Sequence, residues 1–374
     1  MNAPVLSICI PTYNRARVFV DLLDSISREI QGHQDLVEIV VSDNCSTDDT
    51  REVVREFQSA LNIQYSRRNR NIGITANIFL VPSLAKARYC WILGDDDMLV
   101  PGAIAQILQL LSEYPNIPAI VTGYSYQQES NRAHQLAPGA SIEFENPVFR
   151  DLHPPKLISR WEDTFFETDS AALHTSIVSC VFARSEWLRN APEVSGLALK
   201  EPLTSLETTF PHTVVWSTFL IGKPVVFAPA PLVYFFVGSQ EWFEPKWMTI
   251  LFSFGLELAQ RFRDKGACED AVRYYEALIL NHSGLASLIF SPNDYAKEYF
   301  SLAWLIQQYG AREELWRNLS HTFESRSCRE CAFLLQKIIF SCLRAPQHWN
   351  RCLKVTYRQL IRILYSCLTA RTIR

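Results

Sequence analysis

The sequence lacks the features that mark a membrane-spanning or exported chain. It contains no uncharged apolar run of about 18 residues, the length at which a transmembrane helix is expected. No basic stretch followed by an apolar one occurs near the N-terminus, so we expect no signal peptide. The ten cysteines show no framework of paired spacings, and several lie inside apolar runs. These absences predict a protein of the reducing cytosol.

Two common nucleotide-binding signatures are also missing. Neither a G-x-G-x-x-G motif nor a Walker A motif occurs, which argues against a typical dinucleotide enzyme and against a P-loop ATPase. The formal net charge of -3 argues against nucleic acid as a partner. No acidic residue follows Glu330, whereas that last segment contains eight lysines and arginines. The C-terminal end of the chain is therefore uniformly basic.

The first third of the sequence alternates short apolar runs with segments of helical spacing. Strands are predicted at residues 5–10, 37–41, 63–66, 89–93 and 119–122. Asn14 is expected to cap the first helix, and the polar residues 46–49 to cap the second. This alternation predicts an α/β fold with a mostly parallel sheet flanked by helices.

The remaining sequence suggests two further regions. Residues 125–243 show a mixed pattern, and residues 244–374 read as helical almost throughout. We therefore expect a nucleotide-binding half-domain over residues 1–124, an acceptor-binding half-domain over 125–243 and a helical region over 244–374.

Unusual polar residues follow three of the predicted strands. Residues 12–15 follow the first strand, Asp43–Asn44 the second, and the triplet Asp95–Asp97 the fourth. Ligands of parallel sheets bind beyond the carboxyl ends of the strands, so these residues are expected to share one crevice.

Three consecutive aspartates repel one another unless a cation or hydrogen-bond donors offset their charge. At the end of a buried strand they suggest a seat for a hard divalent metal that would in turn hold a phosphate. The alternative for the triplet is a solvated strand-to-helix turn. For Asp43 the alternative is a cap on its own turn. For Asn71, Gly73 and Asn77 it is a loop followed by a helix surface.

Taken in order, these segments resemble the family 2 glycosyltransferases of GT-A fold. The matching segments are residues 7–15, 40–50, 71–73 and 91–97. The Gly94–Asp97 motif and Gly222–Pro224 resemble the branch that contains abequosyltransferases of bacterial O-antigen synthesis. The resemblance implies a metal-dependent, inverting transfer of a sugar from a UDP, CDP or TDP donor. The implied acceptor is a saccharide, with a lipid-linked one expected.

The resemblance also implies roles for individual residues. Asp43 would contact the nucleotide base. Asp96 would ligate Mn²⁺ or Mg²⁺, Asp95 would face the ribose, and Asp97 would support the cluster or ligate the metal through water. The other expected donor-binding residues are Pro11, Thr12, Tyr13, Arg15, Asn44, Asn71, Gly73 and Asn77.

The catalytic base is where this chain departs from the family. Members carry an acidic Glu-Asp motif at the start of a helix, but here that place holds Phe210–His212. The candidates for the base are Glu207, His212 and Asp163, each with an ordinary capping or surface role as the alternative. Two other functions stay open, a nucleotidyltransferase and a sugar-nucleotide-binding protein without catalysis.

The basic C-terminal segment has the pattern of an amphipathic helix over residues 349–368. At helical spacing, apolar and aromatic side chains share one face, and lysines and arginines share the other. Such a helix can lie in an anionic membrane interface, which would attach the protein to the inner face of a bacterial membrane. Packing of the same helix on the protein's own core is the alternative.

Overall fold

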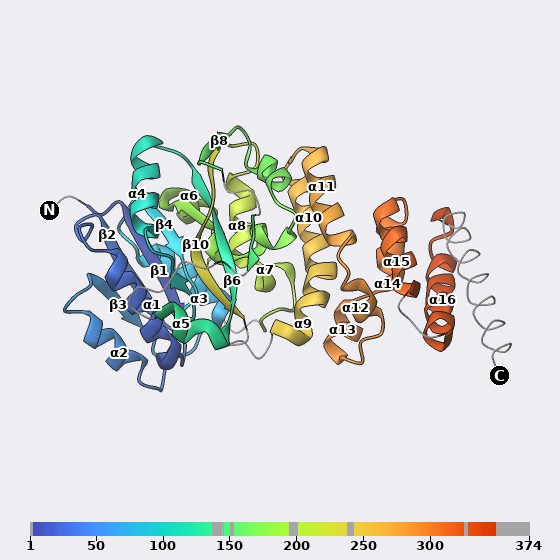
Figure 1. Cartoon of the computed structure of the whole chain (residues 1–374), viewed down its shortest axis with the longest axis horizontal. Helices are drawn as coiled ribbons and strands as arrows, with labels where there is room; N and C mark the ends of the chain where they lie inside the picture. Colours follow the sequence, from blue (N-terminus) through green and yellow to red (C-terminus); the bar gives the residue numbers. More distant parts are fainter. Residues whose placement is uncertain are drawn as a thin grey trace. The chain divides into compact units, whose positions relative to one another are not determined.

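The computed structural model describes residues 3–136, 144, 146–149, 153–193, 201–237, 243–324 and 328–348. The chain divides into two compact units, labelled unit 1 and unit 2 below. Unit 1 comprises Met1–Glu241 with Glu257–Tyr275, and unit 2 comprises Trp242–Leu256 with Glu276–Arg374. Figure 1 labels their elements. The segment 349–368, expected to form a basic amphipathic helix, lies outside the described residues.

Unit 1 is built on a ten-stranded sheet. The strand order is β3-β2-β1-β4-β9-β6-β10-β5, with β7 paired to β6 and β8 paired to β10. The strands are β1 (Leu6–Thr12), β2 (Val37–Asp43), β3 (Ile63–Arg67), β4 (Tyr89–Ile92), β5 (Met98–Leu99), β6 (Ala119–Gln128), β7 (Asn146–Pro147), β8 (Lys156–Ile158), β9 (Cys180–Ala183) and β10 (Val225–Val237).

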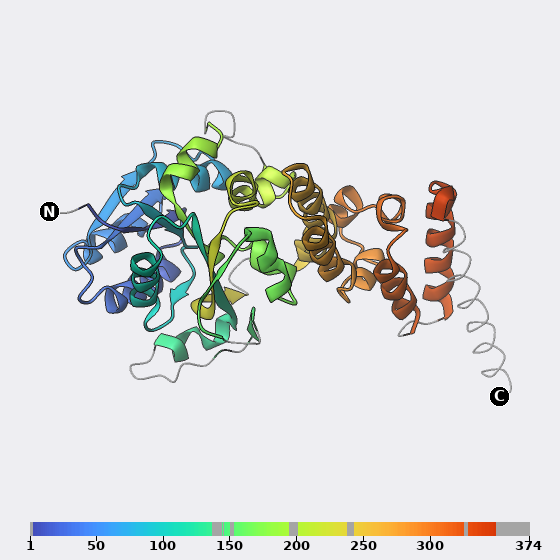
Figure 2. The same ribbon diagram turned by 90° about the horizontal axis from the view of Figure 1, so that it is seen from above.

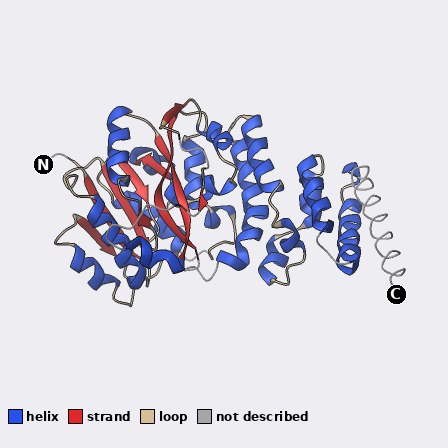
Figure 3. Cartoon of the chain, in the orientation of Figure 1, coloured by secondary structure: helices blue, strands red, loops and turns tan. Residues whose placement is uncertain are grey.

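Most of these strands run in one direction. The pairings give β3, β2, β1, β4, β6 and β10 the same direction, while β5, β7, β8 and β9 oppose them. The predicted α/β fold with a mostly parallel sheet is therefore confirmed (Figure 3). The sequence did not reveal that β9 inserts between β4 and β6.

Helices cover both faces of this sheet. The α-helices that begin in unit 1 are α1 (Ala16–Glu29), α2 (Thr50–Phe57), α3 (Ile74–Leu84), α4 (Ala103–Glu113), α5 (Arg132–Leu136), α6 (Arg184–Asn190), α7 (Leu206–Thr209), α8 (Pro211–Phe219) and α11 (Glu269–Leu280). Helix α10 (Leu256–Asp264) joins them from its second residue onward. On one face α3 packs on β1 and β2 beside α6 and α8, and on the other α1 packs with α2 and α4 (Figure 2).

Short 3-10 helices connect several of these elements. They are η1 (Glu129–Asn131), η2 (Trp161–Glu167), η3 (Ala171–Thr175) and η4 (Ile177–Ser179). The indole N–H of Trp91 in β4 donates to the carbonyl of Val178 in η4 at 2.8 Å. This bond joins β4 to the segment just before β9, and the rings of Phe182 in β9 and Trp187 in α6 stack with centroids 4.9 Å apart. The strand that leads into the aspartate triplet is thus held on a rigid core.

The prediction that Asn14 caps the first helix is wrong. The N-cap of α1 is Arg15, and it makes no side-chain capping bond. Asn14 instead has a φ of 53° and accepts the backbone N–H of Thr47 at 2.7 Å. Asp48 accepts the N–H of Ala16 at 2.9 Å, so the start of α1 is satisfied from the loop after β2. Asn14 tolerates the left-handed conformation that this tight connection requires.

Unit 2 is helical. Its elements are α9 (Phe243–Ile250), the π-helical turn η6 (Leu251–Gly255), the C-terminal end of α11, α12 (Leu285–Ile289), α13 (Asp294–Tyr299), α14 (Leu302–Tyr309), α15 (Glu313–Glu324), α16 (Cys328–Leu343) and the 3-10 helix η7 (Pro346–His348). Buried side chains such as Leu305, Leu319 and Leu334 form its interior. In the part of the chain that the structure describes, no helix is long and apolar enough to cross a membrane.

Candidate active site

The structure brings the three polar strand ends together. Strand β1 lies between β2 and β4, with Thr12 opposite Asp43 and Cys9 opposite Ile92. The backbone N–H of Asn44 donates to the carbonyl of Thr12 at 2.9 Å, so the pairing with β1 extends one residue beyond the end of β2. The predicted donor-binding residues of these strands therefore lie along one edge of the sheet.

The last aspartate of the triplet is buried and folded back onto the turn. Asp97 Oδ2 accepts the backbone N–H of Gly94 at 2.8 Å, whereas Asp97 Oδ1 has no partner among the described residues. Burial raises the pKa of Asp97 well above its ordinary value, and the negative charge of Asp96 adds to the rise. A Cβ at Gly94 would lie 2.8 Å from Asp97 Oδ2. A larger residue at this position would therefore displace the side chain of Asp97 from its bond to the turn.

Arg15 provides the positive charge at the other two aspartates. Its guanidinium hydrogen-bonds Asp96 Oδ2, and its Nε lies 3.4 Å from Asp95 Oδ1. Burial and the charge of Asp96 raise the pKa of Asp95 to about 7, against the opposite influence of Arg15 and Thr12. Because neighbouring carboxylates resist being ionised together, a further cation would favour the state in which all three are charged.

Arg132, which the sequence did not reveal, hydrogen-bonds the backbone of the triplet. Its NH2 donates to the backbone carbonyl of Asp96 at 2.8 Å, and its Nε donates to Glu129 at 2.9 Å. The guanidinium also lies 4.0 Å from the ring centroid of Phe236. Arg132 is only 7% exposed. Its link to the triplet depends on tertiary contact, and no local motif in the sequence signals it.

The aspartates offer oxygen donors that suit Mg²⁺ or Mn²⁺. Within the described ranges, no group of three His, Cys, Asp or Glu side chains is arranged as a complete metal site. Mg²⁺ is usually held by one or two carboxylates and completes its shell with substrate phosphates and water. Asp95 and Asp96 share the strand end, and Asp97 Oδ1 is a buried acceptor without a donor among the described residues. This donor set fits a divalent metal that arrives together with a diphosphate.

The carboxylate of Asp43 is surrounded by hydrogen-bond donors from neighbouring residues. Its Oδ1 accepts the backbone N–H of Ser46 at 2.7 Å, and its Oδ2 accepts the hydroxyl of Tyr65 and lies 3.6 Å from Arg67 Nε. The side chain of Asp43 is 0% exposed, and the side chain of Arg67 is 39% exposed. Burial and, to a smaller extent, the hydrogen bond to Asp43 raise the pKa of Tyr65. The bond to Ser46 is the turn cap named above as the alternative role for Asp43.

The asparagines after β2 and before α3 order the loop around this edge. Asn44 donates to Asn71 Oδ1 at 2.8 Å and accepts the N–H of Ile72 at 2.8 Å. Asn71 Oδ1 also accepts the N–H of Gly73, whose φ of 85° favours glycine. Asn77 is buried rather than on a helix surface, and its amide donates to the carbonyl of Ser42 at 2.8 Å.

Two other predicted donor-binding residues differ in exposure. Pro11 pairs with Ser42 inside the sheet and is half-buried. The side chain of Tyr13 is exposed, at 42%. The side chain of Tyr13 is therefore accessible to a ligand in this structure, whereas the carboxylate of Asp43 is not.

The three candidates for the catalytic base lie on different elements. Asp163 in η2 forms two bonds with Arg160, at 2.7 and 3.0 Å. His212 in α8 is buried, with Nε2 at 3.0 Å from the carbonyl of Thr175, and burial lowers its pKa to about 4. Glu207 in the first turn of α7 is exposed and acts electrostatically on Glu257. Glu207 is thus the accessible carboxylate of the set.

Comparison with known proteins gives a consistent result. Residues 7–182 match the model of glycosyl transferase family 2. An abequosyltransferase of Salmonella typhimurium is 38% identical over 115 residues, which are 30% of this chain and 34% of that protein. The GalNAc(5)-diNAcBac-PP-undecaprenol beta-1,3-glucosyltransferase of Campylobacter jejuni is 33% identical over 120 residues, 29% of this chain and 35% of that one. The chain thus matches about a third of the length of these relatives.

A solved structure resembles the chain over a longer span. The crystal structure of S. aureus TarS 1-349 in complex with UDP-GlcNAc superposes with a TM-score of 0.54 at 13% sequence identity. The superposition covers 95% of this chain and 92% of that one. At this identity the likeness establishes the fold, which is the GT-A fold.

Proposed function

We propose that this chain, whose residues 7–182 are a glycosyl transferase family 2 domain, transfers a sugar from a nucleotide diphosphate donor to a saccharide. The observation that carries the proposal is the cluster of Arg15 and three aspartates at the carboxyl edge of the parallel strands. This is the edge at which sheets of this kind bind ligands. The names of the relatives support a role in bacterial surface polysaccharide synthesis.

The leaving diphosphate would be bound at the triplet. Asp96 would ligate Mn²⁺ or Mg²⁺, Asp95 would face the ribose, and Asp97 would support the cluster. A divalent metal held here would supply Lewis-acid stabilisation of the negative charge that develops on the diphosphate. Arg15 now pairs with the same carboxylates, so we propose that its guanidinium turns to the phosphates when a donor binds. Arg132 would keep the backbone of Asp96 in place during that exchange.

The nucleotide base would lie beside β2 and β3. Because the carboxylate of Asp43 is fully buried, we propose that it acts on a uracil, cytosine or thymine base mainly through Tyr65 and Arg67. Tyr13 and the loop of Asn44, Asn71 and Gly73 would complete this part of the pocket. Asn77 would contribute by fixing Ser42 and so the end of β2.

We propose an inverting transfer with Glu207 as the base that takes the proton of the acceptor hydroxyl. Glu207 is exposed, whereas Asp163 is held bidentately by Arg160 and His212 is buried. A base must reach the acceptor proton before its pKa matters, and accessibility therefore favours Glu207. His212 and Asp163 are the second and third candidates.

The acceptor would be a lipid-linked saccharide. The relative from Campylobacter jejuni carries a polyprenol diphosphate in its name, which supports this class of acceptor. An acceptor of that kind lies at a membrane surface, so the proposal includes peripheral attachment at the inner face of a bacterial membrane. The basic segment 349–368 has the sequence pattern for such attachment.

A thermal-shift screen with donor hydrolysis tests the proposal. UDP, CDP, TDP and GDP sugars are tested with and without Mn²⁺, and release of free nucleoside diphosphate is followed with the best donor. We expect one pyrimidine donor to raise the melting temperature only with metal. Asp96→Ala should remove that shift and slow hydrolysis on the order of a thousandfold, because a Lewis acid contributes several kcal/mol.

The exposed Asp35 provides the matched control, since Asp35→Ala removes a carboxylate outside the site. A metal-dependent shift that persists in Asp96→Ala would disprove the role of Asp96. A shift without any nucleoside diphosphate release would favour the alternative of a binding protein without catalysis. Release of pyrophosphate on incubation with a nucleoside triphosphate and a sugar phosphate would favour the nucleotidyltransferase.

A further inference from the structure

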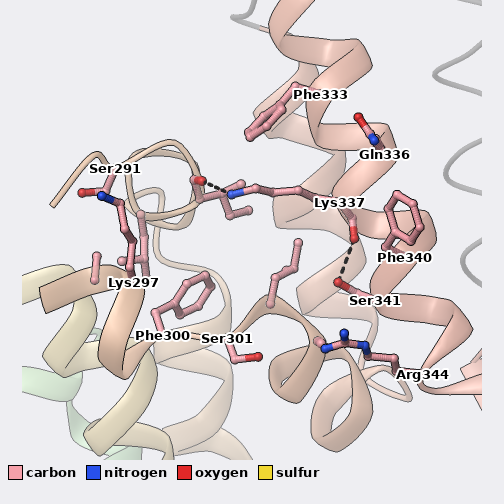
Figure 4. Close-up of a pocket in the computed structure, with 15 residues that line it drawn as sticks. Ser291, Lys297, Phe300, Ser301, Phe333, Gln336, Lys337, Phe340, Ser341 and Arg344 are labelled. Atoms are coloured by element: carbon pink, nitrogen blue, oxygen red, sulfur yellow. Dashed lines mark hydrogen bonds between the residues drawn. The ribbon is translucent and has the colours of Figure 1, made fainter. Parts of the chain in front are cut away.

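We propose that a groove in unit 2 binds a lipid that carries a phosphate head group. The groove has a volume of ≈ 470 Å³ and lies between α16 and the segment from Leu288 to Ala303 (Figure 4). All of its lining residues belong to unit 2, whereas the strand-end site belongs to unit 1. The inference concerns binding alone, and it does not require that the chain transfers a sugar.

One face of α16 forms a wall of the groove. The lining side chains of this helix are Phe333, Gln336, Lys337, Phe340, Ser341 and Arg344, which includes the residue just past its end. Their spacing places them on a single side of an α-helix. The face therefore presents two phenyl rings and two cationic groups to the same space.

The apolar part of the groove is open to solvent. Phe333 is 45% exposed and Phe340 is 59% exposed. Across from them, Leu288, Ile289 and Phe300 line the other wall. Contiguous exposed apolar side chains with a polar rim are typical of a binding surface. These side chains suit a hydrocarbon chain.

The polar part of the groove is basic. Lys297, Lys337 and Arg344 line it, and no acidic residue does. Lys337 Nζ donates to the carbonyl of Ile289 at 2.9 Å and lies 4.7 Å from the ring centroid of Phe333, so this cation stays beside the apolar wall. Lys297 Nζ forms an ion pair with Asp294 Oδ1 at 2.8 Å. Within the described residues, no carboxylate pairs with Arg344.

The start of α14 adds a second favourable feature for an anion. Ser301 is the N-cap of this helix and accepts the N–H of Trp304 at 3.2 Å. Ser301, Leu302 and Ala303 line the groove together with Arg344. Backbone N–H groups at a helix N-terminus favour negative charge, and phosphate in particular. Arg344 and this helix end are therefore the expected contacts of the phosphate.

This combination of charge and apolarity favours an amphiphile as the occupant. A free phosphate would leave Phe333 and Phe340 exposed, and a neutral lipid would leave Arg344 without a partner. A lipid with an anionic head satisfies both parts at once. We therefore assign the phenyl rings to the hydrocarbon chain, and Arg344 with the start of α14 to the phosphate.

Titration calorimetry of the full chain with dihexanoyl phosphatidic acid, kept below its micelle concentration, tests the assignment. Arg344→Glu should weaken binding about tenfold, as expected for loss of a charge-assisted hydrogen bond. Phe340→Ser should weaken it about tenfold through lost apolar contact. Glycerol 3-phosphate, which lacks the acyl chains, and dihexanoylglycerol, which lacks the phosphate, should both bind much more weakly.

The chain offers a matched control for each variant. Arg317 is an exposed arginine of α15 that does not line the groove, and Leu343 is 60% exposed on α16 outside the lining. Arg317→Glu and Leu343→Ser should leave the affinity within about twofold of the parent, because neither removes a groove contact. Each variant is first compared with the parent by thermal melting, so that a folding defect is separated from a binding defect.

Several outcomes would overturn the proposal. Equal weakening by Arg317→Glu and Arg344→Glu would show a diffuse charge effect. Unchanged binding in all four variants would place the lipid elsewhere, the basic segment 349–368 included. A loss of self-association in Phe340→Ser with no change in lipid binding would assign the groove to a second copy of the chain. Donor hydrolysis is measured separately on every variant, so failure of this inference is distinguishable from failure of the proposed function.

Discussion

Unit 1 buries carboxylates at both edges of the same parallel strands, and their surroundings differ. At the amino edge, Glu38 accepts the hydroxyl of Ser7 at 2.6 Å and the backbone N–H groups of Lys86 and Ala87 at 2.6 and 3.0 Å. At the carboxyl edge, Asp97 has one oxygen bonded to Gly94 and one without a described partner. Glu38 Oε1 thus accepts three donors, whereas Asp97 Oδ1 accepts none, and an unsatisfied buried polar atom is a candidate for function.

The largest effect on stability is expected at the amino edge. Glu38→Ala leaves the Ser7 hydroxyl and the N–H of Lys86 without their acceptor, and it leaves the N–H of Ala87 with only Ser7 Oγ, at 3.2 Å. We expect the free energy of unfolding to fall by about 3 kcal/mol, since each unsatisfied buried group costs 1 kcal/mol or more. Urea unfolding followed by tryptophan fluorescence measures this.

Glu56, an exposed glutamate, is the control, and Glu56→Ala should change stability little. Folded Glu38→Ala should also keep the same thermal response to donor and metal as the parent. A weakened donor response in protein that remains folded would mean that the two edges are not independent.

A smaller effect is expected when the charge is removed at the carboxyl edge. In Asp97→Asn the amide oxygen can still accept the N–H of Gly94, and the buried negative charge is gone. Because burial raises the pKa of Asp97, its ionised form is unfavourable in the folded state. We expect the free energy of unfolding to stay within about 1 kcal/mol of the parent or to rise.

The same urea experiment measures Asp97→Asn, and donor affinity is read in parallel. A loss of stability as large as that of Glu38→Ala would remove the distinction between the two edges. A stable Asp97→Asn variant with weakened metal-dependent donor binding would sharpen it.

A third effect, which depends on pH, concerns a buried group away from both edges. Burial lowers the pKa of His212 to about 4, and its only described polar contact is the carbonyl of Thr175. A histidine whose folded pKa is depressed stabilises the protein fully above its unfolded pKa of about 6.5, and this contribution is lost as the pH falls toward 4. Stability should therefore decline over that range.

Replacing the imidazole isolates this contribution. His212→Phe should unfold with a shallower pH dependence between about 6.5 and 4, although it loses the bond to Thr175 at every pH. Urea midpoints across this pH range test it. His174, whose pKa burial lowers to about 3, and Asp95, whose pKa is about 7, stay in both proteins and contribute to the remaining slope. An unchanged slope would mean that burial of His212 carries no proton-linked cost.

Local sequence pattern predicted much of the parallel half of the fold. The apolar runs that become β1, β2 and β4 and the helical spacing of α1, with Phe19, Leu22 and Ile26 buried, follow from periodicity. The insertion of β9 could not be foreseen, because it pairs residues about ninety positions apart in an antiparallel register. A short apolar run predicts a strand, but it does not predict which other strand will pair with it.

The candidate site shows the same division. The strand-end aspartates were visible because consecutive carboxylates after an apolar run are unusual. The partners Tyr65 and Arg67 of Asp43 depend on the register between β2 and β3, in which Asp43 lies opposite Arg67. Arg132 reaches the triplet through tertiary packing. Residues of the site that depend on register or packing were thus the ones that the sequence did not reveal.

The place of β9 also has a consequence for the order in which the chain can acquire its structure during synthesis. When a ribosome has released residues through Ile92, β3, β2, β1 and β4 can already pair, but one edge of β4 has no neighbour. That edge is completed only when Cys180–Ala183 emerges. Exposed strand edges invite pairing with other chains. Fragments that end before Ala183 should therefore aggregate more readily than fragments that include it.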